Sequence, residues 1–165
     1  MSRRLGVWPL VAAMLTVAPS ADAQDASSQQ WAIAIWGFSY HFNRNVEYNE
    51  HNWGVGVRDS MNGRYFFEAD ALRNSHNGLI VPLSAGAEFK VASLFGRCRL
   101  QAVAAFTVAY YGLPDEGSSA VRFGPLPGAA IGCGRFKANT MVVLSPSSQL
   151  FAAIVTFFTI RLSSH

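Results

Sequence analysis

The chain has 165 residues; 50% are hydrophobic and only 14% are charged. The formal net charge is +3 and the cations are spread along the chain, which argues against a nucleic-acid-binding patch. After the N-terminal segment, no run reaches the ~18 uninterrupted apolar residues of a membrane helix. The composition leaves two classes of fold, a soluble β-rich domain or a transmembrane barrel whose strands alternate their faces.

The N-terminal segment has the pattern of a secretory signal peptide. Arg3 and Arg4 form a short basic region, an apolar stretch follows, and the small residues of "ADA" precede Gln24. We therefore expect the signal peptide to cover residues 1–23 and a single domain to cover 24–165. A retained membrane anchor is the alternative, which no stop-transfer pattern supports.

Eight strand-like runs follow, separated by turn signals. They cover residues 31–42, 52–59, 64–73, 79–91, 97–111, 122–134, 137–144 and 150–162. In the first run, Trp36, Phe38, Tyr40 and Phe42 are expected to share one face. Even strand number, about ten residues per strand and alternating faces are typical of bacterial outer-membrane barrels. We predict an all-β fold, an eight-stranded antiparallel transmembrane β-barrel.

Charged residues on the third to fifth runs share the phase opposite the apolar face. Unpaired charges are costly inside a small barrel, but charges on neighbouring strands can pair there. The predicted lumen charge network consists of Glu68, Asp70, Glu88, Lys90, Arg97 and Arg99.

A soluble lipocalin-like barrel is the alternative, with apolar residues inside and charges outside. Aromatic residues near the strand ends favour the membrane barrel, because they suit interfacial girdles. These residues are Trp53, Tyr65, Tyr110 and Tyr111.

The connections alternate between short turns and longer polar loops. The short turns "SMNG", "ASLFG" and "GRF" are expected to face the periplasm, and the loop that contains Ser75 and His76 to face outside. Cys98 begins the fifth run and Cys133 ends the sixth, so the two can lie opposite each other near the periplasmic rim. An exported protein can form this disulfide, and two separate buried thiols are the alternative.

The stretch "ALRNSHNGLIVP", residues 71–82, supplies a candidate nucleophile in Ser75. Acyl transfer or ester hydrolysis needs a hydroxyl activated by a nearby base. His76 is a poor base for Ser75, because adjacent side chains on an extended chain point to opposite sides. His41 or His51 can approach across the rim, oriented by Glu47 or Glu50. The alternative interpretation is a polar, turn-forming loop without chemistry.

Prolines inside strands remove ladder hydrogen bonds. Pro82, Pro125 and Pro127 therefore indicate either a weakened seam that admits a lipid tail or local bulges.

Three stretches carry a resemblance to a known family. They are "YNEHNWGVGV" (48–57), "GRYFFEADALRNSHNGLIVPLSAGAEF" (63–89) and "GPLPGAAIGCG" (124–134). Together they resemble the lipid A palmitoyltransferases, eight-stranded outer-membrane barrels that move a palmitoyl chain from a phospholipid to lipid A. The family's serine matches Ser75, while Asn74 replaces its aspartate and Ile35 stands at the place of its histidine.

The sequence predicts a barrel of the bacterial outer membrane that contacts phospholipid and lipopolysaccharide as a monomer, without nucleic acid or a cofactor. Its candidate catalytic residues are Ser75, His41, His51 and Glu50, and no metal-ligand spacing is present. Acyl transfer on lipid A or phospholipid is one function hypothesis. A non-enzymatic barrel with a structural or surface-contact role is the second, and a soluble periplasmic lipid-binding barrel is the third.

Overall fold

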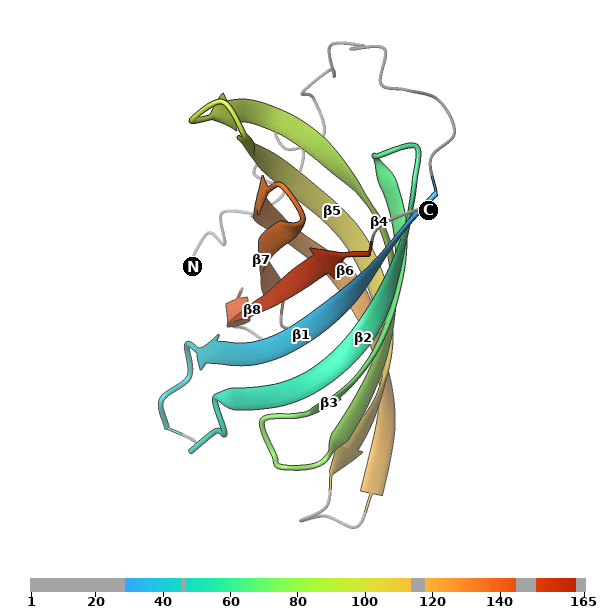
Figure 1. Ribbon diagram of the computed structural model, residues 1–165. Coiled ribbons are helices and arrows are strands. Elements are labelled where there is room, and N and C mark those ends of the chain that lie inside the picture. The colour runs from blue at the N-terminus through green and yellow to red at the C-terminus, as the bar shows by residue number, and fades with distance from the viewer. Residues whose placement is uncertain (1–28, 46, 114–117, 145–150, 163–165) are drawn as a thin grey trace, which may run out of the picture.

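The computed structural model describes residues 29–45, 47–113, 118–144 and 151–162, and the predicted signal peptide lies outside them. The described chain is all-β and forms a closed antiparallel barrel, in which β1 to β8 pair in chain order and β8 pairs with β1 (Figure 1). The strands are β1 Gln30–His41, β2 His51–Met61, β3 Tyr65–Arg73, β4 Leu79–Leu94, β5 Cys98–Leu113, β6 Ser118–Cys133, β7 Phe136–Leu144 and β8 Phe151–Arg161. The predicted strand number and topology are confirmed, although β4 ends later and β6 begins earlier than expected.

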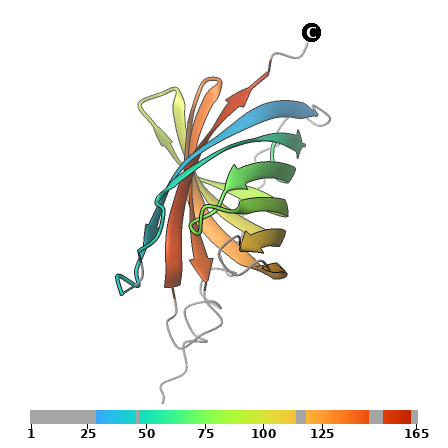
Figure 2. The same cartoon turned by 90° about the horizontal axis from the view of Figure 1, so that it is seen from below.

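The two ends of the barrel differ in their connections. At the turn end, uppermost in Figure 1, short turns join β2 to β3, β4 to β5 and β6 to β7. In the first of these, Asn62 and Gly63 both have positive φ angles, 54° and 60°, as the primed hairpin turns require. At the loop end lie the β1–β2 connection, residues 42–50, and the β3–β4 loop, residues 74–78. Figure 2, a view from below, shows the tilted strands around one interior.

The prediction that Trp36, Phe38, Tyr40 and Phe42 share one face of β1 is wrong at one residue. Both ladders of β1 shift register between Trp36 and Phe38: against β8, Gly37 is one extra residue, whereas against β2 two residues of β2 lie opposite Gly37. Trp36 therefore points inward and stacks on Phe157, with ring centroids 4.2 Å apart, whereas Phe38 is exposed. The bulge moves the rest of β1 into the opposite phase, and this places His41 on the inner side of the rim.

The outer face of the wall is apolar. Exposed Ile, Val, Leu and Phe side chains occur on all eight strands, mostly in alternation with buried or half-buried positions. Trp53, Tyr65 and Tyr110 belong to this outer face as expected, but Tyr111 is half-buried on the inner side. No helix in the described part of the chain is long and apolar enough to cross a bilayer.

A buried ionic layer fills the middle of the barrel. Arg58 Nε donates to Glu68 Oε2 at 2.5 Å, and Arg58 Nη1 donates to Glu88 Oε1 at 2.8 Å. The Arg58 guanidinium also lies over the Phe66 ring, 4.2 Å from its centroid. Arg58, Glu68 and Glu88 are all buried, and both carboxylates are paired with Arg58.

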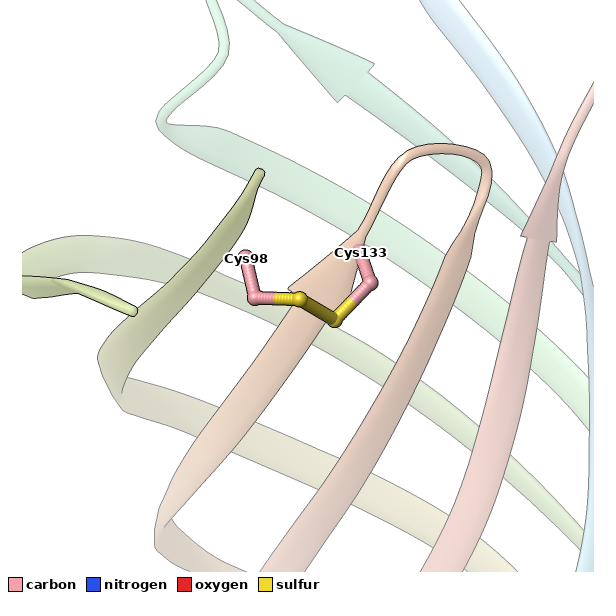
Figure 3. Close-up of a disulfide and its surroundings, with 2 residues drawn as sticks. All are labelled: Cys98 and Cys133. Atoms are coloured by element: carbon pink, nitrogen blue, oxygen red, sulfur yellow. A yellow bond between two sulfur atoms is a disulfide. The ribbon is translucent and has the colours of Figure 1, made fainter. Parts of the chain in front are cut away.

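A disulfide joins β5 and β6 at the turn end (Figure 3). Cys98 and Cys133 are direct partners in the β5–β6 ladder, and their sulfur atoms are bonded. The disulfide predicted from the position of the two cysteines is confirmed.

Candidate catalytic dyad at the loop end

Asn74 organises the β3–β4 loop. Its Oδ1 accepts hydrogen bonds from the backbone amides of His76 and Gly78, both at 2.9 Å. Its Nδ2 donates to the Gly112 carbonyl on β5 at 2.6 Å. Asn77 closes the loop with a positive φ of 62°, a conformation that asparagine tolerates. These bonds hold the intervening residue, Ser75, in a defined position.

Ser75 and His41 meet across the inner rim. Their Oγ and Nε2 atoms are 2.7 Å apart, although the residues are 34 positions apart in the sequence. A neutral imidazole with its hydrogen on Nδ1 can accept the serine proton at Nε2. Ser39 Oγ lies 3.3 Å from the same nitrogen. The pair thus has the hydrogen-bonding geometry of a nucleophile and its general base.

The β1–β2 connection packs against this pair. The Tyr48 ring stacks on the His41 imidazole, with centroids 4.2 Å apart and an interplanar angle of 21°. The backbone amide of Asn49 donates to the Ser75 carbonyl at 2.9 Å, which ties the two loops together. His41 is therefore restrained by ring stacking as well as by its hydrogen bonds.

Glu50 contacts the backbone of His41 rather than its ring. Glu50 Oε1 accepts from the His41 amide at 3.2 Å and from Arg44 Nη1 at 2.8 Å. The amide hydrogen bond and the nearby Arg44 guanidinium lower the pKa of Glu50 below its usual value, so the carboxylate is ionised at neutral pH. Glu50 shapes the connection and acts on the imidazole only through space.

The other two histidines considered as bases, His51 and His76, occupy different places. His51 is exposed on the outer face, where its ring meets the edge of Phe38 at 5.5 Å. His76 adjoins Ser75 but packs edge-on against Tyr48, at 5.5 Å, and against Tyr111, at 6.3 Å. Of the histidines considered as bases, the structure brings only His41 to the Ser75 hydroxyl.

The arrangement favours proton removal from Ser75 more clearly than it favours oxyanion binding. The amide after a serine nucleophile often supplies an oxyanion-hole donor. Here that amide, from His76, is occupied by Asn74 Oδ1. Ser75 is also buried, with 8% of its surface exposed, so a substrate reaches the hydroxyl only if the loop moves. In the described residues, no group of three or more His, Cys, Asp or Glu side chains could hold a metal ion.

The predicted lumen network divides into two groups. Glu68, Asp70 and Glu88 are buried within the barrel, whereas Lys90, Arg97 and Arg99 are exposed. The cations that pair with Glu68 and Glu88 come from outside the predicted set. Lys137 Nζ donates to Glu88 Oε2 at 2.5 Å, and Arg58 provides the other pairs.

Two side chains that surround the His41 imidazole, Tyr48 and Ser39, were missed as neighbours of the candidate base. Tyr48 was visible in the Tyr-Asn-Glu stretch, but its stacking on His41 depends on how the connection folds back. Ser39 lies two residues before His41 on β1, and the alternation of the strand already predicts that the two side chains share a face.

No protein-family model matches the chain, and no curated protein matches it significantly.

Proposed function

We propose that the protein is a bacterial outer-membrane barrel that transfers or hydrolyses lipid acyl groups, with Ser75 as nucleophile and His41 as general base. The observation that carries this proposal is the 2.7 Å contact between Ser75 Oγ and His41 Nε2. The resemblance of residues 48–57 and 63–89 to the lipid A palmitoyltransferases supports the same chemistry. Phospholipid is the proposed acyl donor, and lipid A or water is the acceptor.

The outer face supports a place in a membrane. A soluble domain rarely exposes a contiguous apolar patch of more than a few hundred Å². In this barrel, outward-facing Val, Leu, Ile and Phe side chains surround the wall, while Arg58, Glu68 and Glu88 are buried inside. A polar interior within an apolar wall is the pattern of transmembrane barrels.

Interruptions in the wall offer lateral access for an acyl chain. The β6–β7 ladder runs from Cys133–Phe136 only as far as Gly128–Met141, so β6 continues toward the loop end without a described partner on β7. Pro125 and Pro127 lie in that unpaired stretch, as expected for residues that cannot donate to a ladder.

A second interruption lies closer to Ser75. The β3–β4 ladder pairs Ala69 with Leu83 and then resumes at Leu72 with Ile80, and Pro82 lies between them on β4. The predicted weakened seam therefore has a structural counterpart near the loop end.

The reaction follows from the dyad. Ser75 Oγ attacks the ester carbonyl of the donor lipid while His41 Nε2 takes the serine proton. Collapse of the tetrahedral intermediate breaks the ester bond, and the leaving alcohol takes the proton from His41, which leaves an acyl-serine. A hydroxyl of lipid A, or water, then attacks this ester and passes its proton to His41, and His41 gives this proton to Ser75 Oγ as the bond between the serine and the acyl group breaks.

A non-enzymatic barrel with a structural role is the second candidate. It is favoured by the burial of Ser75 and by the bond between the His76 amide and Asn74 Oδ1. In this case the His41–Ser75 contact closes the loop end of the barrel and has no chemical role.

Mass spectrometry of lipid A and phospholipids distinguishes the two candidates. The full chain and its Ser75→Ala and His41→Ala variants would be expressed in a Gram-negative host, with folding checked by the heat-modifiable mobility typical of such barrels. Acyl transfer predicts a new acylated lipid A or a lysophospholipid with the unaltered chain, and a loss of at least about a hundredfold in either variant.

Two matched controls isolate the dyad. Ser39→Ala removes the other hydroxyl near His41 Nε2, and His51→Ala removes an exposed imidazole on the outer face. Both should leave the lipid change in place. An unaltered lipid profile with the folded full chain, or equal activity in Ser75→Ala, would contradict the enzymatic proposal.

A further inference from the structure

The turn end of the barrel contains a cavity with an excess of positive charge. Its volume is about 400 Å³, within the usual range of small-ligand pockets. Of the described residues that line it, six are cationic and only Glu88 is acidic. The six cationic residues are Arg58, Arg97, Arg99, Arg135, Lys137 and Arg161.

Glu88 is already neutralised by its neighbours. Arg58 Nη1 donates to one of its carboxylate oxygens, and Lys137 Nζ and Gln101 Nε2 donate to the other. This carboxylate therefore has little capacity left for a further cation. The hydrogen-bonding capacity of Glu88 is thus taken up by Arg58, Lys137 and Gln101. It does not balance the positive charge of the other arginines that line the cavity.

Four arginines around the cavity make no side-chain ion pair, hydrogen bond or ring contact within the described residues. They are Arg97, Arg99, Arg135 and Arg161. All four are exposed and they come from three parts of the chain that the barrel brings together. Clustered like charges repel one another, so their convergence on one cavity costs stability unless an anion enters it.

The strand register makes this cluster a consequence of the fold. Arg99 on β5 is paired with Gly132 on β6, and Gly132 is paired with Lys137 on β7. Gly132 has no side chain, which leaves space between the two cations. The Cys98–Cys133 bond joins the residues next to Arg99 and Gly132, and so holds this wall of the cavity together.

We propose that the cavity at the turn end binds a phosphate-bearing anion. Guanidinium groups match phosphate oxygens in bidentate geometry, and several of them can share the charge of one phosphate or diphosphate. The phosphate group can belong to a lipid headgroup of the adjacent leaflet or to a soluble phosphate compound. The site lies across the Arg58 layer from the dyad and does not depend on the proposed acyl chemistry.

Calorimetric titration of the folded barrel tests this site. The protein is held in an uncharged, phosphate-free maltoside detergent, and inorganic pyrophosphate is the soluble probe. In a parallel experiment, phosphatidic acid or uncharged diacylglycerol is added to the micelles. The lipid that stays bound to the purified barrel is then quantified by mass spectrometry. Binding in the first arm indicates a soluble ligand, and selective retention of phosphatidic acid indicates a lipid headgroup.

Arg99→Gln and Arg161→Gln remove charge from the cavity wall, singly and together. Each is expected to weaken phosphate binding about tenfold, with a larger loss in the double variant. The single variants, both at exposed side chains, keep the test valid if the double variant does not fold. Arg73→Gln removes an exposed cation at the end of β3, at the opposite end of the barrel, and should leave binding unchanged. Failure of the full chain to bind either probe, or equal binding by Arg99→Gln, Arg161→Gln and Arg73→Gln, would overturn the proposal.

Discussion

The two ends of this barrel contrast in how their polar groups are satisfied. At the loop end, Ser75 bonds to His41, the Asn74 side chain bonds to neighbouring backbone, and the Tyr48 ring stacks on His41. At the turn end, four arginines line an open cavity without acidic partners among the described residues; they are Arg97, Arg99, Arg135 and Arg161. A closed hydrogen-bonded cluster can align reacting groups, whereas an excess of cations around a cavity is suited to holding an anion.

The Arg58 layer is a buried set of ion pairs, and its removal should have the largest effect on stability. Arg58→Ala would leave the Glu68 and Glu88 carboxylates buried without their main cation, at a cost of about 3–5 kcal/mol in the free energy of unfolding. Chemical unfolding in detergent micelles measures this loss. The control, Arg73→Ala at an exposed strand end, should stay within about 0.5 kcal/mol of the unaltered chain. Equal stability of the two variants would contradict a structural role for the layer.

Asn74→Ala should destabilise the loop end, with an intermediate loss in the free energy of unfolding. It removes one group that accepts two backbone hydrogen bonds and donates a third, for an expected loss of about 1–3 kcal/mol in the free energy of unfolding. Asn74→Asp keeps the two accepted bonds but loses the donor to Gly112, so it should be the milder change. Unfolding curves of both variants test whether Asn74→Ala loses more stability than Asn74→Asp. A smaller loss in Asn74→Ala would show that Asn74 Oδ1 does not organise the loop.

Glu50→Gln should have the smallest effect on the stability of the protein, and this effect should depend on pH. Hydrogen bonding from the His41 amide lowers the pKa of Glu50 below its usual 4.5, so ionised Glu50 favours the folded connection. Its contribution is present above the usual value and is lost as the pH falls through the lowered pKa. Unfolding midpoints measured from about pH 6 to about pH 3 should converge for the two proteins at low pH. A difference that stays constant with pH would exclude this linkage.

Much of the barrel could be predicted from local patterns. Alternating faces and turn residues such as Asn62 and Gly63 predict strands and hairpins because both depend on the local chain. The predicted face of β1 holds after Gly37, where Phe38 and Tyr40 point outward, but it is wrong at Trp36, because the irregularity at Gly37 is set by pairing with the neighbouring strands. The sequence left His41 and His51 as alternatives for the base, because contacts across the rim depend on how the barrel closes.

The buried network was harder to predict than the strands. Its acids lie on β3 and β4, but Lys137 comes from β7 on another part of the wall. Pairing across the lumen depends on closure of the barrel, which the alternation in single strands does not describe. Asn74 shows the same limit, because its contact with Gly112 joins two distant connections of the loop end.

Labelling of Ser75 by a serine-reactive phosphonate tests the central claim most directly. The folded barrel would be treated with the reagent in micelles, and the peptide that contains Ser75 would be analysed by mass spectrometry. Activation by His41 predicts an adduct on Ser75 in the unaltered chain and in His51→Ala, and its loss in His41→Ala. The absence of any adduct, or equal labelling of His41→Ala and His51→Ala, would contradict the claim that His41 makes Ser75 nucleophilic.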